Sequence, residues 1–160
     1  MTNLEFFKAC FNNELNATRA IFEALPADQL DYRPHPVNRS AYEIVEHILG
    51  HMVDFKVILE NNQVDETLTY KFENPSDAGK QFGILADAVN KALSQASESD
   101  WDSQPVELKI NGNSFLTIPR SQMIWFFFFD IIHHRGQLSS YIRPMGGNNP
   151  AVYGYSADTI

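Results

Sequence analysis

The chain has 160 residues, 44% of them hydrophobic, which predicts one globular domain over residues 1–160 with a sizeable buried core. Its formal net charge of -8 argues against a nucleic-acid partner and against an anionic membrane surface, because there is no cationic surplus to neutralise phosphate. The single Cys10 excludes an internal disulfide, and the first residues lack the basic and apolar segments of a signal peptide, so we expect a cytoplasmic protein.

The first half of the chain predicts two long helices separated by a loop. Over residues 3–25 apolar side chains recur near helical spacing, and Pro26 is expected to stop this helix. Residues 27–39 contain alternate prolines and predict a loop. Ser40 is a favourable N-cap, and Glu43 three residues later completes a capping box. A second helix is therefore predicted from Ser40 to about residue 60.

The second half predicts two more helices and a short hairpin. Residues 61–74 are polar and are predicted to be irregular, and residues 75–97 form the third helix. Residues 106–110 and 114–118 flank Asn111-Gly112-Asn113, which favours a β-hairpin. Pro119 then opens the fourth helix, which ends near Arg143, and residues 146–158 form an ordered loop. The prediction is an all-α fold: a four-helix bundle with a small β-hairpin before the last core helix.

The fourth predicted helix carries an unusual polar group beside a solid aromatic run. Asp130 and His134 are four residues apart, so their side chains lie on one helix face about one turn apart. That face also carries apolar residues, and an unpaired charge in such a setting is costly. A divalent metal ion could satisfy both groups. His47, in the apolar pattern of the second helix, is the candidate third ligand, because facing helices of a bundle can bring it to this pair.

Other interpretations of these residues stay open at this point. The histidines could be buried core residues bonded to carboxylates or backbone groups. Asp130 could orient His134 or pair with Arg135 instead of binding metal. His51, one turn beyond His47, could replace it as a ligand.

Three further polar residues of the fourth helix have candidate roles. Gln137 is placed to orient a ligand or substrate, and His133 points about 100° away from His134 around the helix. Arg135 and Arg143 are candidates for binding an acidic substrate, although Arg135 is more simply explained by an ion pair within the bundle.

The run from Trp125 to Phe129 is apolar around the whole helix circumference. A domain of this size can cover one face and both flanks of such a helix. The remaining apolar surface predicts a homodimer that forms through the helices.

Several segments resemble the DinB/YfiT-like superfamily of small bacterial metal-dependent four-helix-bundle proteins. The strongest is Asp130-x-x-His133-His134-Arg135-Gly136-Gln137, and the segment from Ser40 to His51 places His47 at the family's first metal histidine. The resemblance covers nearly the whole chain. It implies a divalent metal ion held by His47, Asp130 and His134, with Asp130 standing where many members have histidine. The resemblance favours zinc or nickel over ferrous iron, which the same donors also suit.

The resemblance also implies a metal-dependent enzyme that acts on a small-molecule substrate, as a thiol-dependent S-transferase or a hydrolase, with a low-molecular-weight thiol as partner. No catalytic residue beyond the metal site stands out, and there is no nucleophilic serine or cysteine motif. Two alternatives therefore remain: a non-catalytic metal- or ligand-binding stress-response protein that acts as a dimer, and a structural dimer with core histidines.

Overall fold

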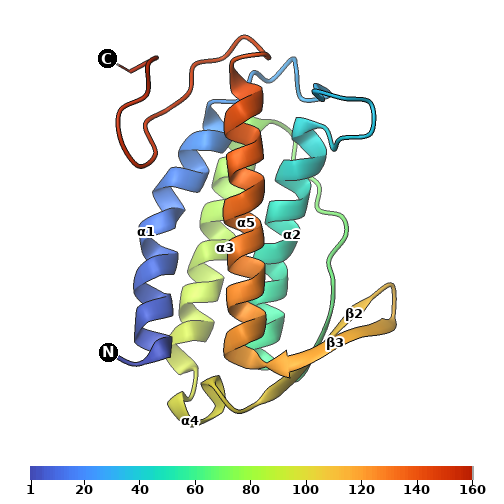
Figure 1. The fold of residues 1–160 in the computed structure, drawn as a ribbon, viewed down its shortest axis with the longest axis vertical. Helices are drawn as coiled ribbons and strands as arrows, with labels where there is room; N and C mark the ends of the chain where they lie inside the picture. Colours follow the sequence, from blue (N-terminus) through green and yellow to red (C-terminus); the bar gives the residue numbers. More distant parts are fainter. Residues whose placement is uncertain (160) are drawn as a thin grey trace.

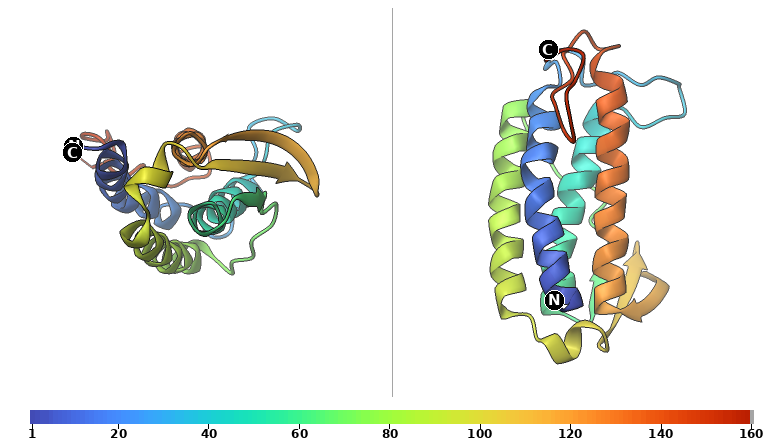
Figure 2. Two further views of the ribbon diagram at one scale, coloured as in Figure 1. Left: turned by 90° about the horizontal axis from the view of Figure 1, so that it is seen from below. Right: turned by 60° about the vertical axis from the view of Figure 1, so that its left-hand side comes forward.

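The computed structural model describes residues 1–159 and consists mainly of four long helices that surround one core (Figure 1). These are α1 (Asn3–Glu23), α2 (Ala41–Glu60), α3 (Pro75–Gln95) and α5 (Arg120–Ile142). The predicted bundle is confirmed. Helices α1 and α5 run in one direction and α2 and α3 in the other, and contacts follow the order α1, α3, α2, α5 around the bundle (Figures 1 and 2).

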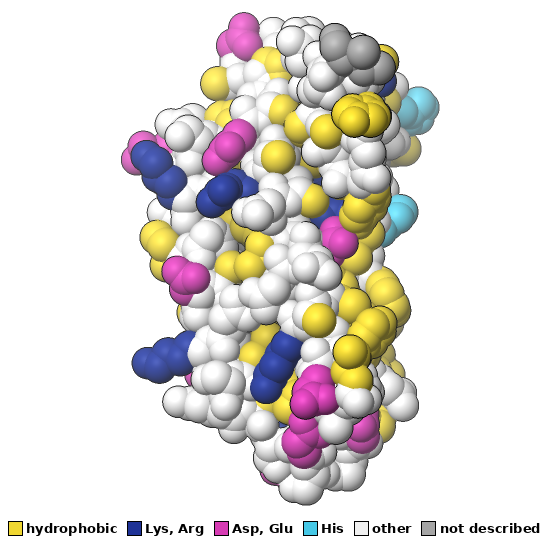
Figure 3. All heavy atoms as spheres, turned by 90° about the vertical axis from the view of Figure 1, so that its left-hand side faces the viewer, with side chains coloured by type: hydrophobic (Ala, Val, Ile, Leu, Met, Phe, Trp, Pro, Cys, Tyr) yellow, Lys and Arg dark blue, Asp and Glu magenta, His cyan; other side chains and the backbone are white. Residues whose placement is uncertain are grey.

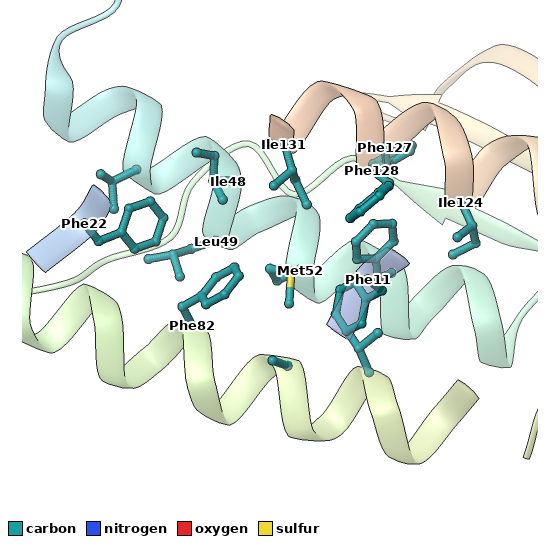
Figure 4. Close-up of a cluster of buried hydrophobic side chains, with 14 of the residues drawn as sticks. Phe11, Phe22, Ile48, Leu49, Met52, Phe82, Ile124, Phe127, Phe128 and Ile131 are labelled. Atoms are coloured by element: carbon teal, nitrogen blue, oxygen red, sulfur yellow. The ribbon is translucent and has the colours of Figure 1, made fainter. Parts of the chain in front are cut away.

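Each of the four helices contributes large apolar side chains to the shared core. Phe11 from α1, Leu49 from α2, Phe82 from α3 and Phe128 from α5 are all buried and face the same interior (Figure 4). Burial of this apolar surface is the main force that holds the helices side by side. The core fixes the rotation of α2 and α5 about their axes, and hence the direction in which their polar residues point.

The connection between the parallel helices α2 and α3 returns along the length of the bundle (Figure 1). Residues 61–74 were expected to be irregular throughout, but Gln63–Asp65 forms a short strand, β1. It pairs parallel with β2 (Pro105–Ile110), at one edge of a three-stranded sheet. The sequence hides this strand because only one of its three side chains, that of Val64, is buried. The pairing is made by the backbone.

The predicted hairpin is confirmed. Strand β2 pairs antiparallel with β3 (Asn113–Pro119), and its turn has positive φ angles of 52° at Asn111 and 76° at Gly112, as a two-residue hairpin turn requires. A short helix that was not expected, α4 (Glu98–Trp101), precedes it and buries Trp101. The sheet lies beside the lower ends of α2 and α5 (Figure 1).

The connection after β1 lies unusually close to α2. A Cβ atom at Gly50 would be only 2.4 Å from the carbonyl oxygen of Thr67, so only glycine allows this approach. One turn further along α2, both carboxylate oxygens of the fully buried Asp54 accept a hydrogen bond from the Thr67 N–H, each at 3.1 Å. These contacts fix the connection, including Glu66, against the face of α2 that carries the histidines.

The C-terminal segment packs back on the bundle as an ordered loop. Its Tyr153 hydroxyl donates to Glu14 at 2.6 Å, and the Asp158 carboxylate accepts from Arg143 at 2.9 Å. Within the described residues 1–159, no helix has the length and apolar character needed to cross a membrane.

Candidate metal centre

Helix α2 presents two histidines to α5. The Ser40 hydroxyl accepts the Glu43 N–H at 3.2 Å while the Glu43 carboxylate accepts the Ser40 N–H at 2.6 Å, which confirms the predicted capping box. The start of the helix is thereby fixed, and His47 and His51 follow one turn apart on one face. Both rings are buried, and they lie 4.1 Å apart between centroids.

Helix α5 places Asp130 and His134 opposite these rings, again one turn apart. The Asp130 Oδ2 atom lies 3.0 Å from Nε2 of His47, 2.9 Å from Nε2 of His51 and 3.3 Å from Nε2 of His134. The structure therefore brings the three predicted residues, His47, Asp130 and His134, to one point. It adds His51, the alternative ligand, to the same cluster.

The separations fit a shared ion. The ligand atoms of His47, Asp130 and His134 all lie within 4.8 Å of one another. Two donors that bind one tetrahedral ion at about 2.0–2.1 Å are themselves about 3.3 Å apart. Small side-chain movements would satisfy this geometry. Two imidazole nitrogens and one carboxylate oxygen are donors typical of zinc, nickel and ferrous iron sites.

In each of the three histidine rings, the Nδ1 atom, which does not contact Asp130, lies near an oxygen of another residue. His134 Nδ1 is 2.9 Å from the Gln137 amide oxygen, and donation from Nδ1 to this oxygen would leave the Nε2 lone pair for a metal ion. His51 Nδ1 lies 3.5 Å from Asp54, and His47 Nδ1 lies 3.9 Å from Glu66. The last two distances are too long for hydrogen bonds, and His51 Nδ1 is a buried atom without a hydrogen-bond partner.

The Gln137 contact predicts a measurable effect on metal affinity. Gln137→Ala removes the acceptor that orients His134, so we expect zinc affinity to fall by about tenfold or more, in line with the loss of other groups that orient a ligand. Gln137→Glu keeps an acceptor oxygen at the same place and should restore most of the affinity. Competition with a chromophoric chelator measures both. Equal affinities for wild type and Gln137→Ala would remove Gln137 from the site.

The ionisation of the cluster favours metal binding at His47. Burial raises the pKa of Asp130, but hydrogen bonds from His134, His47 and His51 outweigh it and hold the pKa far below its usual range. Burial lowers the pKa of His47 more than the Asp130 contact raises it, so this ring stays neutral. A neutral imidazole is the form that binds metal.

His51 differs from His47 in the direction of its pKa shift. Burial alone would lower the pKa of His51, but the hydrogen bond to Asp130 and the negative charges of Asp130 and Asp54 together raise it. The two carboxylates that flank this ring therefore favour its protonated form. This contrast supports His47 rather than His51 as the α2 ligand.

The cluster lies at the base of a cavity of about 320 Å³. The Asp130 side chain is 32% exposed, so the meeting point of the rings is open on this side. The polar part of the lining is Arg39, Glu66 and the cluster itself. The rest is apolar and comes from the hairpin and α5, namely Leu108, Ile110, Phe115, Phe126 and Phe127.

Sequence reasoning did not single out three residues of this site. Asp54 could have been found, because it is an acid on an otherwise apolar helix face three residues after His51. Glu66 and Arg39 lie in loops, where no periodic pattern relates them to α5. Only the tertiary structure places them at the cavity.

Arg135 and Arg143, the candidates for binding an acidic substrate, instead form ion pairs with other residues of the chain. The buried Arg135 donates hydrogen bonds to Glu14 at 2.5 Å and to Thr18 at 3.3 Å, which is the ion pair within the bundle that we expected. Arg143 pairs with Asp158. Neither lines the cavity.

The side chains of His133 and Gln137 contact each other beside the cluster. His133 is exposed and faces away from the cluster, and its Nε2 atom is 2.9 Å from the Gln137 amide nitrogen. Gln137 therefore links the two neighbouring histidines.

Comparisons with known proteins agree with this architecture. The model of the DinB family matches residues 1–159. An uncharacterised protein of Bacillus subtilis (strain 168), YjoA, is 24% identical over 149 residues, which cover 89% of this chain and 91% of the relative.

Two crystal structures share the fold. The DinB-like protein YjoA from Bacillus subtilis has a TM-score of 0.70 at 20% identity and covers 91% of this chain and 96% of its own. A DinB-like protein from Bacillus cereus ATCC 10987 has a TM-score of 0.74 at 19% identity, with 93% and 97% covered.

Proposed function

This chain belongs to the DinB family, and we propose that it binds one divalent metal ion through His47, Asp130 and His134 and uses that ion on a small molecule. One observation carries the proposal. Three imidazole Nε2 atoms meet a single carboxylate oxygen at the base of an open cavity of about 320 Å³. A purely structural cluster has no need of a cavity at the meeting point.

Zinc or nickel is the proposed ion, with ferrous iron as the alternative, because the donor set is two imidazoles and one carboxylate. A bound ion would supply Lewis acidity and would lower the pKa of a water or thiol at its open position. The chain's own residues prepare the site: Gln137 orients the His134 ring, and the aromatic side chains of Phe126 and Phe127 form an apolar part of the cavity wall.

The reaction class that we propose is thiol-dependent S-transfer or hydrolysis. In the transfer, the sulfur of a low-molecular-weight thiol forms a bond to an electrophilic carbon, the leaving group departs with its electron pair, and the thiol proton passes to solvent. None of the described residues that line the cavity is a serine or a cysteine, so the nucleophile in this proposal is the thiol or water.

A turnover screen separates an enzyme from a binding protein. Zinc- or nickel-loaded protein is incubated with a thiol and an electrophilic acceptor, and with hydrolysable esters and amides, beside the His47→Ala variant. Turnover that His47→Ala abolishes is the expected result. A metal-loaded protein that turns over none of them would instead favour a non-catalytic metal- or ligand-binding protein.

We also propose that the protein is a homodimer that forms through α1 and α5. Phe6 of α1 and Phe129 of α5 are 51% and 61% exposed, and both line an apolar groove of about 590 Å³ between these helices. Hydrophobic side chains gather along this edge of the molecule (Figure 3). An exposed patch of this kind is typical of an interface.

Light scattering at micromolar concentration tests the dimer. The wild type is expected to have twice the mass of one chain, and Phe129→Ser should shift it toward a single chain because it places a polar group in the apolar contact. Phe115→Ser is a matched control, because Phe115 is similarly exposed, at 64%, but lies on the hairpin. A monomeric wild type would overturn the proposal.

A further inference from the structure

Arg39 is the one arginine that has no partner among residues 1–159. It is exposed, lines the cavity beside Asp130, and takes part in no ion pair or side-chain hydrogen bond there. Its backbone is nevertheless fixed, since its carbonyl oxygen accepts the Tyr141 hydroxyl at 3.2 Å. The other five arginines all contact carboxylates or backbone oxygens: Arg19 with Glu23, Arg33 with Glu43, Arg120 with Ile58, Arg135 with Glu14 and Arg143 with Asp158.

The acids nearest to Arg39 along α2 are already engaged. Glu43 accepts the Ser40 N–H at 2.6 Å and pairs with Arg33 at 3.5 Å. Glu46 accepts the Tyr70 N–H at 3.1 Å. The Arg39 guanidinium therefore remains available, and it offers a planar set of donors that matches a carboxylate.

Apart from Arg39, Glu66 and the histidine–aspartate cluster, the lining of the cavity is apolar, and part of it is open to solvent. Phe115 of the hairpin is 64% exposed and Phe126 of α5 is 49% exposed, and both line this one cavity. Leu108 and Ile110 extend the same wall along β2. Two large aromatic side chains left exposed at the rim of one cavity are typical of a surface that a ligand covers.

We infer that the cavity binds a small organic anion, with its acidic group on Arg39 and its apolar body against the wall formed by Leu108, Ile110, Phe115 and Phe126. This inference rests on the proposal that the cavity is the substrate site of the metal centre. The volume of about 320 Å³ holds roughly ten non-hydrogen atoms, taking about 30 Å³ for each. The chemical class is therefore a short-chain or aromatic carboxylate.

The test is calorimetric titration with octanoate, a carboxylate of this size, on metal-free and zinc-loaded protein. Octanol and octylamine have the same chain without the negative charge and serve as matched ligands. The variants are Arg39→Gln and, as a control, Arg33→Gln, whose arginine pairs with Glu43 and does not line this cavity. Circular dichroism shows that each variant is folded, and mass spectrometry gives its zinc content.

The expected result is that zinc-loaded wild type binds octanoate at least about tenfold more tightly than octanol, and does not bind octylamine. Arg39→Gln should weaken octanoate binding about tenfold and leave zinc content unchanged, because a charged hydrogen-bond partner is lost. Arg33→Gln should bind as wild type does.

Three results would overturn the inference: no octanoate binding, equal binding of octanol, or octanoate binding that Arg39→Gln leaves intact. In the last case the ion alone would hold the carboxylate. Failure of the metal proposal is seen separately, because a wild type without bound zinc would show it whatever the octanoate titration gives. Arg39-dependent binding to metal-free protein would then still support an anion site.

Discussion

Replacing His47, Asp130 or His134 by alanine is expected to lower zinc affinity at least 100-fold. In the proposed site each of these side chains supplies one of the three donors that the chain gives to the ion, and even a residue that merely orients a ligand commonly changes metal affinity 10–100-fold. Competition with a chromophoric chelator at neutral pH measures the loss. His35→Ala is the matched control, because His35 is exposed in the loop before α2 and lies outside the cluster.

The same experiment decides between the two histidines of α2. His51 is flanked by Asp54 and Asp130, which favour its protonated form, so His51→Ala should weaken zinc binding far less than His47→Ala. A larger loss of zinc affinity in His51→Ala than in His47→Ala would identify His51, and not His47, as the ligand from α2. Undiminished zinc binding in all the variants would locate the metal elsewhere.

Arg135→Met is expected to lower the free energy of unfolding by about 3 kcal/mol. The Arg135 guanidinium is buried and pairs with Glu14 at 2.5 Å, and it also contacts Thr18 and the hydroxyl of Tyr153. Methionine keeps much of the volume but leaves the Glu14 carboxylate, which is only 18% exposed, without its cation. An uncompensated charge in such a place is costly. Urea unfolding followed by circular dichroism measures the change.

Arg143→Met is the matched control for this prediction. Arg143 lies just after the last turn of α5 and pairs with Asp158 at the surface, where ion pairs contribute little. Its loss should leave the unfolding midpoint nearly unchanged. The double variant Glu14→Leu with Arg135→Met should be more stable than Arg135→Met alone, since it removes both charges. A single variant as stable as wild type would mean that desolvation of the pair cancels its attraction.

The sequence predicted the helices because their signals are local. The Ser40–Glu43 capping box, the proline before the last helix and the Asn111-Gly112 turn each depend on a few neighbouring residues, and the structure has all three. Strand β1 could not be predicted in this way. Its three residues pair through the backbone with a strand more than forty positions away, so no periodic pattern marks it.

The residues of the candidate site that lie on helix faces could be predicted from the sequence. The spacing of Asp130 and His134 gave one pair, and His47 could be placed opposite because facing helices meet in a bundle. The raised pKa of His51 depends on Asp54 and Asp130 together, which only the folded chain brings close to this ring. Arg39 enters the site from a loop, so its position follows from tertiary structure alone.

The most direct test of the metal centre is the metal content of untagged protein that is purified without chelator, measured by mass spectrometry beside His47→Ala and His134→Ala. We predict close to one equivalent of a transition metal in the wild type and almost none in either variant. A wild type without metal, which also retains none after zinc, nickel or ferrous iron is supplied, would contradict the account. The four side chains would then form only an internal hydrogen-bonded cluster.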